Sequence, residues 1–356
     1  MARLLGVELN RRSVLLGIGA VGAFLAVDFG AVAYANNWIG GSGLSRKTFI
    51  DGFRFVFGSQ PGFRKNHAKG VAVVGHFDSN GNGRELSRAA VFRPGQTPVI
   101  GRFSLAGGNP FMADTPSTAR GLGLAFGFPG ATQWRTAMLN TPVFLDNSAQ
   151  GFYDRLLASK VVPATAQPDP AVMSAFLAAH PETAAAMAVI KQHPASGGFA
   201  DSTFRGLNTF FFVNDAGART PVRWSLVPLQ AALPPQPGGA NALFDALIRQ
   251  LRARPLQWRL VLTVGTSADP LLDATRPWPT DRRAIDAGLL TLTGIETEEP
   301  GNARDVNFDP LVLPDGIEPS ADPLLSARSA VYAASYRARA GEPKSPSAVQ
   351  VNEVAQ

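Results

Sequence analysis

Short apolar, β-branched segments recur along the chain from about residue 70 onward. They cover residues 71–77, 97–104, 121–128, 141–145, 209–213, 221–227, 258–264 and 289–292, and Gly, Pro, Asn and Asp separate them. The connections that begin at Asp78 and Asn214 have the composition of hairpin turns. Eight strands at this spacing predict a barrel or a sandwich.

Three other segments have helical patterns. Residues 170–192 are rich in Ala and Met, and residues 241–252 place four apolar side chains on one face. A third helix is predicted after Asp322-Pro323, which supplies an N-cap and a proline in the first turn. The pattern predicts an α+β fold, with a single domain over residues 36–343 and a polar tail over residues 344–356.

The N-terminal region has the pattern of an export signal. An apolar run over residues 13–27 follows Arg11-Arg12, and its roughly 15 residues are fewer than the about 20 of a membrane span. Arg11-Arg12-Ser13-Val14-Leu15-Leu16 resembles a twin-arginine signal, and Ala33-Tyr34-Ala35 offers a cleavage site. An uncleaved anchor is the alternative. We expect a periplasmic protein, soluble after cleavage of residues 1–35 or tethered to the inner membrane by residues 13–35.

Composition limits the chemistry that this chain can perform. The 356 residues include no cysteine, which excludes disulfides, thiolate ligands and iron–sulfur clusters, and only four histidines and four tyrosines. The net charge is +6, from 33 basic and 27 acidic residues. No basic run interleaved with aromatic residues accompanies this charge, so we expect no nucleic-acid partner.

Two segments bring reactive side chains together. His67 lies just before the first predicted strand, between Arg64, Lys65 and Lys69, where it can face an anion; an ordinary structural histidine is the simpler alternative. On the helix after Pro323, Arg328 and Tyr332 are i,i+4 neighbours, and Arg339 extends the same face. A guanidinium one turn from a phenol favours the phenolate, although a surface arginine–aromatic pair has the same spacing.

Several collinear motifs resemble the catalase superfamily. They are Arg64-x-x-His67-Ala68-Lys69-Gly70, Thr97-Pro98 followed by Arg102-Phe103-Ser104, Ala113-Asp114-Thr115, Arg120-Gly121-Leu122, Asn140-Thr141-Pro142-Val143-Phe144, Phe308-Asp309-Pro310, Pro314-x-Gly316-Ile317-Glu318 and Arg328-x-x-x-Tyr332. Because the chain ends soon after the tyrosine helix and carries an export signal, it is most similar to the short catalase-related peroxidase branch.

The resemblance implies a fold and a set of roles. The fold is an eight-stranded antiparallel β-barrel with surrounding helices and a C-terminal haem-ligating helix, and the cofactor is haem b. Tyr332 is implied as the iron ligand, supported by Arg328. His67 and Ser104 are implied as the catalytic pair. The other implied cofactor contacts are Arg64, Arg102 and Arg339 on the propionates, with Phe144 and Phe152 lining the distal channel and the haem face.

Two positions depart from the family pattern. Leu139 stands where catalases carry the distal asparagine, and Asn66 replaces the valine before the histidine. We therefore expect a peroxidase that reduces organic hydroperoxides and hydrogen peroxide with a small organic donor, and that has weak catalase activity. The alternatives are a hydroperoxide isomerase of the allene oxide synthase type and a non-catalytic haem-binding or sensor module. We expect membrane contact only through the N-terminal segment, and a homo-oligomer remains open.

Overall fold

The computed structural model describes residues 44–130, 132–234 and 238–355. The predicted export signal or anchor, with its cleavage site, therefore lies outside the described residues. The chain divides into two compact units, Met1–Thr48 and Phe49–Gln356. The fold described below is that of the second unit, which carries all the predicted site residues.

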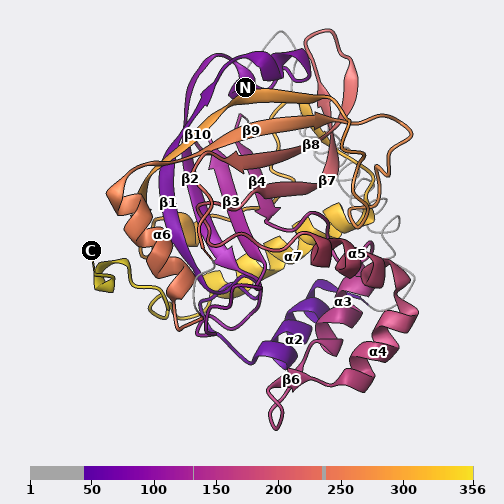
Figure 1. Cartoon of the computed structure of the whole chain (residues 1–356), viewed down its shortest axis with the longest axis vertical. Helices are drawn as coiled ribbons and strands as arrows, with labels where there is room; N and C mark the ends of the chain where they lie inside the picture. Colours follow the sequence, from indigo (N-terminus) through magenta and orange to yellow (C-terminus); the bar gives the residue numbers. More distant parts are fainter. Residues whose placement is uncertain (1–43, 131, 235–237, 356) are drawn as a thin grey trace, which may run out of the picture. The chain divides into compact units, whose positions relative to one another are not determined.

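Eight antiparallel strands form a closed barrel (Figure 1). In order around the barrel they are β7 (Phe204–Val213), β4 (Trp134–Leu139), β3 (Arg120–Phe126), β2 (Gly95–Leu105), β1 (Gly70–Ser79), β10 (Ala284–Glu296), β9 (Leu256–Val264) and β8 (Arg219–Pro228). Pairing of β7 with β8 closes the ring, and the short strand β11 (Ile317–Pro319) pairs antiparallel with β7. A two-residue pair, β5 (Val161–Val162) and β6 (Gln167–Pro168), lies apart from the barrel sheet. The predicted barrel is confirmed.

Side chains along the strands alternate between the barrel interior and its surface, and the inward-facing ones fill the interior. In β9, Leu256, Trp258, Leu260 and Leu262 are buried, while the residues between them are at least partly accessible. This period of two places every second side chain in the interior. Aromatic rings pack against one another there: Trp134 stacks on Phe126 with ring centroids 4.9 Å apart, and both side chains are buried in the apolar core.

The predicted strand over residues 141–145 is wrong, since the strand lies just before it. In β4 the buried residues Trp134, Thr136 and Met138 alternate with more accessible ones. Pairing ends at Asn140, whose side-chain oxygen accepts a hydrogen bond from the backbone N–H of Arg120 at 2.8 Å. The chain then turns, and Pro142 has no N–H to continue a ladder. The other seven predicted segments overlap barrel strands.

Six α-helices are present in the described residues. They are α2 (Arg46–Phe57), α3 (Ala149–Ala158), α4 (Pro170–Ala179), α5 (Pro181–Gln192), α6 (Ala242–Ala253) and α7 (Pro323–Ala340). The single predicted helix over 170–192 is thus two helices that break at His180, because the residue before a proline is disfavoured in the helical region. Helix α7 starts as predicted, with Asp322 accepting from the N–H of Leu324 at 2.9 Å.

In the described ranges, no single helix is long and apolar enough to span a membrane. Helices α4 and α5 taken together have the required length and hydropathy, but they are bent by 108° relative to each other.

Residues 344–355, predicted as a polar tail, pack against the barrel domain. Val349 and Val351 are only 1% and 6% exposed and belong to the same apolar cluster as the barrel interior. The N–H of Val351 donates to Oγ1 of Thr297 at 2.9 Å, and Arg252 of α6 donates to the carbonyls of Val351 and Val354. We call residues 344–355 the C-terminal strap.

Candidate active site

A single cavity collects all nine residues predicted for the site. It contains about 1120 Å³ of empty space, part of which is open to solvent, a size that suits a large cofactor and a small substrate. The predicted residues that line it are Arg64, His67, Arg102, Ser104, Phe144, Phe152, Arg328, Tyr332 and Arg339. They come from the loop before β1, from β2, from the turn after β4, and from α3 and α7. Only the tertiary fold brings these segments together.

His67 and Ser104 form a hydrogen-bonded pair in this cavity. Nδ1 of His67 lies 3.0 Å from Oγ of Ser104, which in turn is 3.5 Å from the carbonyl oxygen of Gly121. A Cβ on Gly121 would lie 2.8 Å from Ser104 Oγ and 2.9 Å from His67 Nδ1. Position 121 therefore requires glycine for the pair to approach so closely.

The backbone of His67 adopts a conformation that non-glycine residues rarely take, with φ of 53°. Oδ1 of Asn66 accepts from the N–H of His67 at 2.9 Å and from the N–H of Gly107 at 3.0 Å. The amide of Asn66 thus stabilises the strained turn that presents the imidazole. Sequence reasoning assigned no such role to Asn66.

Burial and positive charge keep the His67 imidazole neutral. Burial, followed by the charges of Arg102, Arg328 and Arg64, lowers the pKa of His67 to about 3. The accessible part of its side chain faces the cavity. At neutral pH the ring is therefore uncharged, and one of its nitrogens can accept a proton.

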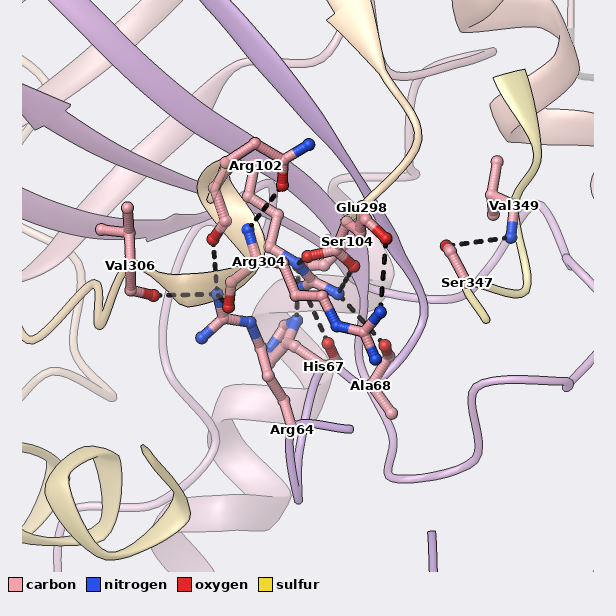
Figure 2. A network of polar contacts seen from close by, with 12 residues as sticks. Arg64, His67, Ala68, Arg102, Ser104, Glu298, Arg304, Val306, Ser347 and Val349 are labelled. Atoms are coloured by element: carbon pink, nitrogen blue, oxygen red, sulfur yellow. Dashed lines mark hydrogen bonds and ion pairs between the residues drawn. The ribbon is translucent and has the colours of Figure 1, made fainter. Parts of the chain in front are cut away.

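Arg102 is held by a buried carboxylate. Its Nε and Nη2 donate to the two oxygens of Glu298 at 2.7 and 2.8 Å, and Nη1 and Nη2 donate to the carbonyls of His67 and Ala68 (Figure 2). Burial alone would raise the pKa of Glu298, but the charge and hydrogen bonds of Arg102 hold it below its usual value. Among the described contacts, one N–H on Nη1 remains for any further acceptor. The main role of Arg102 in this structure is to anchor the His67 turn.

Arg64 and Arg339 are oriented by the same short loop. Arg64 Nη2 donates to the carbonyls of Ala303 and Val306 at 3.0 and 2.9 Å, and Arg339 donates to those of Arg304 and Val306. Arg339 is 2% exposed, and within the described residues its Nε has no hydrogen-bond partner.

Both of these guanidinium groups experience a local excess of positive charge. Burial and the charges of Arg102 and Arg339 lower the pKa of Arg64 well below its ordinary value. Burial and the charge of Arg102 lower that of Arg339 to about 10. A carboxylate ligand would relieve this excess and would pair with the Nε of Arg339.

On α7, Arg328 is fixed by a buried chain of polar side chains. It donates to Oδ1 of Asn208 and, at 3.2 Å, to the carbonyl of Ala137. Nδ2 of Asn208 donates to Asp322 at 2.7 Å, so the residue that caps the helix also orients the arginine. Sequence reasoning paired Arg328 with Tyr332 and did not find Asn208, which lies on β7, far away in the chain.

Aromatic side chains from two helices line the other part of the cavity. Phe152 of α3 packs against Phe144 and against two residues of α2, Phe49 and Phe53, with ring centroids 6.2 to 6.3 Å apart. Leu139 also lines the cavity. The α2 residues were not predicted, although the spacing of Phe49, Phe53 and Phe57 is a helical signal that could have found them.

The residues of the cavity fit haem. A tyrosine is one of the side chains that hold haem iron in proteins, and Tyr332 lines the cavity together with His67. The unpartnered Nε of Arg339 and the charge on Arg64 match two acidic substituents. The aromatic wall matches an apolar ring system.

The chain is similar to catalases and to catalase-related peroxidases. A family model described as Catalase matches residues 61–237. The chain is 36% identical to a catalase-related peroxidase of Synechococcus elongatus, over 93% of this chain and 97% of that protein. It is 30% identical to a catalase-related peroxidase of Mycolicibacterium paratuberculosis, over 84% of this chain and 96% of that protein.

Solved catalase structures share the fold. A fungal catalase aligns with a TM-score of 0.70 and 21% identity, over 82% of this chain and 64% of the catalase. Catalase A from Saccharomyces cerevisiae aligns with a TM-score of 0.69 and 22% identity, over 85% and 67% respectively. The chain thus spans about two thirds of the length of these enzymes. It belongs to the catalase superfamily, in the short catalase-related peroxidase branch.

Proposed function

We propose that this protein is a haem b-dependent peroxidase that reduces organic hydroperoxides, and also hydrogen peroxide, with a small organic electron donor, and that has weak catalase activity. Membership of the catalase-related peroxidases supports the peroxidase type of oxidoreductase reaction. The observation that carries the proposal is the convergence of nine residues, distant in sequence, on one cavity.

The chain supplies both the iron ligand and the contacts to the propionates. Tyr332, as phenolate, would bind the iron, and bound haem would supply the redox centre that accepts electrons from the donor and passes them to peroxide. Arg64 and Arg339 would bind the propionates, with Arg102 offering its remaining N–H. Arg328, held by Asn208, would place a positive charge one helical turn from the ligating tyrosine.

His67 would move the proton during peroxide cleavage. Because Nδ1 faces Ser104, Nε2 is the nitrogen free to take the proton from one peroxide oxygen and to return it to the leaving oxygen. The low pKa of His67 keeps this nitrogen unprotonated at neutral pH. Ser104 would act by holding the tautomer and the ring orientation.

The apolar wall favours organic substrates. Leu139 has no hydrogen-bonding group to orient a second hydrogen peroxide molecule, which supports weak dismutation. The rings of Phe49, Phe53, Phe144 and Phe152 offer apolar contact to an alkyl or aryl hydroperoxide or to an organic donor.

The test is a visible spectrum of purified protein treated with an alkyl hydroperoxide and a reducing dye. We expect a Soret band in the wild type and a shift or loss of that band in Tyr332→Phe. In His67→Ala we expect the haem band to remain and dye oxidation to be lost. His76→Ala, on strand β1 outside the cavity lining, is the matched control. Absence of a Soret band would refute the proposal. Peroxide consumption without dye oxidation would favour an isomerase, and haem binding without turnover would favour a carrier or sensor.

We also propose a periplasmic location, through export of residues 1–35 or tethering by residues 13–35. The arginine pair and the apolar run of the N-terminal sequence support it. Fractionation of cells expressing the full chain tests it, with an Arg11→Lys/Arg12→Lys variant as the control for a twin-arginine route. Retention of wild-type protein in the cytoplasm would refute it.

A further inference from the structure

The loop that orients Arg64 and Arg339 is itself held in place by the C-terminal strap. This loop contains a short 3-10 helix, Ala303–Asp305, whose carbonyls, with that of Val306, accept from both guanidinium groups. Since the acceptors lie on the loop, its position decides where the two arginines point.

Three contacts join the strap to this loop and to α7. Arg304 Nη2 donates to the carbonyl of Ser345 at 2.6 Å. Lys344 Nζ donates to the carbonyl of Arg339 at 3.1 Å and lies 3.9 Å from Asp305. The strap thus contacts the loop on one side and the end of the arginine-bearing helix on the other.

The strap also contributes to a second cavity, which is lined by four arginines. Arg64, Arg102, Arg304 and Arg339 line a second, smaller cavity together with Glu298, and Ser347 of the strap forms part of its wall. Figure 2 shows Ser347 with its hydroxyl accepting a hydrogen bond from the backbone N–H of Val349. Burial of Arg102, Arg304 and Arg339 strengthens their attraction for an acidic ligand.

The strap is anchored at a point remote from the main cavity. Arg252 of α6 donates to the carbonyls of Val351 and Val354 at 2.8 and 2.6 Å, and neither Arg252 nor the two valines line the main cavity. Val349 and Val351 add apolar burial to this anchor.

We propose that the C-terminal strap is a positioning element for the cofactor: by ordering loop 303–306 it aligns Arg64 and Arg339 with the haem carboxylates and so sets how tightly haem is retained. This inference rests on the proposed function, because it requires haem in the main cavity. It assigns a role to residues 344–355 that neither the motifs nor the barrel explain.

The experiment compares Arg252→Gln with Arg249→Gln, an exposed arginine of the same helix. Deletion of residues 344–356 removes two buried valines and risks unfolding, so the single substitutions carry the test. The first readout is the rate of haem transfer from holoprotein to apomyoglobin. The second is hydrogen exchange of residues 303–306 in the apoprotein.

We expect Arg252→Gln to release haem about tenfold faster, on the scale of one or two lost hydrogen bonds, and to exchange faster at residues 303–306. Arg249→Gln should match the wild type in both the rate of haem release and the rate of hydrogen exchange. Arg304→Gln, which removes the Arg304–Ser345 hydrogen bond and leaves the contacts of Lys344, should also speed haem release, and Arg252→Lys should partly restore retention.

An Arg252→Gln protein whose strap exchanges faster, but whose haem transfer stays within twofold of wild type, would overturn the inference. If the wild type takes up no haem, the proposed function fails instead. In that case unchanged exchange at residues 303–306 in Arg252→Gln would refute the ordering role as well.

Discussion

The hydroxyl of Ser104 lies 3.0 Å from Nδ1 of His67, although the two residues belong to different segments of the chain. Ser104 pairs with Gly70 across the β1–β2 ladder, and His67 precedes that ladder by three residues. The register of two barrel strands therefore sets the orientation of the imidazole. Any shift of one residue would turn Ser104 to the opposite face of the sheet.

Removal of the Ser104 hydroxyl should slow peroxide reduction without loss of the fold. We expect Ser104→Ala to lower the second-order rate constant for an alkyl hydroperoxide about five- to tenfold, the scale of one hydrogen bond. Stopped-flow spectroscopy of the haem band measures it. Ser174→Ala, on the exposed side of α4, is the control, and an unchanged rate in Ser104→Ala would remove Ser104 from the mechanism.

Position 139 should control the balance between the catalase and peroxidase reactions. Leu139→Asn places a hydrogen-bond donor on the cavity wall, so oxygen release from hydrogen peroxide should rise at least about fivefold, which corresponds to about 1 kcal/mol. Leu139→Met keeps the wall apolar and should behave as wild type. An oxygen electrode measures the outcome, and equal rates in both variants would contradict the role of this residue.

The aromatic residues of α2 should select for organic substrates. Phe53 is 3% exposed and packs on Phe152, whereas Phe55 on the same helix is 58% exposed. Phe53→Ala should raise KM for an aryl hydroperoxide about tenfold, as expected for loss of about 1 to 2 kcal/mol of apolar contact, and leave KM for hydrogen peroxide unchanged. Phe55→Ala is the control. Parallel changes for both peroxides would indicate a general distortion instead.

The low pKa of His67 predicts a pH-dependent loss of stability in the apoprotein. Its pKa is about 3 when folded, against about 6.5 when unfolded, so between these values the unfolded chain binds more protons. The free energy of unfolding should therefore fall as the pH drops from about 6.5 towards 3, by about 2 kcal/mol at pH 5 from this residue. Urea unfolding at pH 7 and pH 5 tests it. His67→Gln should lack this contribution to the pH dependence of the free energy of unfolding. The same pH dependence in the variant as in the wild type would contradict the prediction.

The barrel core should tolerate cavities poorly. Phe103 is fully buried and packs on Phe199, Phe204 and Trp258. We expect Phe103→Ala to lower the free energy of unfolding by about 3 to 5 kcal/mol. Phe128→Ala, at a side chain that is 76% exposed, should change it by less than about 0.5 kcal/mol. Chemical denaturation followed by tryptophan fluorescence measures the free energy of unfolding of both variants. Similar free energies for Phe103→Ala and Phe128→Ala would show that the core relaxes around the cavity.

Local sequence patterns were sufficient to predict most of the barrel strands and the start of α7. Period-two burial in β9 and the Asp322-Pro323 cap are both properties of adjacent residues, so sequence reasoning could read them directly. It failed at residues 141–145, where a β-branched, apolar composition resembles a strand but Asn140 and Pro142 end the ladder. It also failed at His180, where Pro181 divides a continuous apolar helix pattern.

By itself, the sequence determined which chemistry was available: without cysteine, with His67 before a strand and Tyr332 one turn after Arg328, the reactive groups were already limited to a few side chains. Only the tertiary structure decided how those groups are supported. The pairing of Arg102 with Glu298, the link from Asp322 through Asn208 to Arg328, and the strap on loop 303–306 each join residues far apart in the chain. Such contacts depend on barrel closure and on the desolvation of charges, and neither leaves a periodic signal in the sequence.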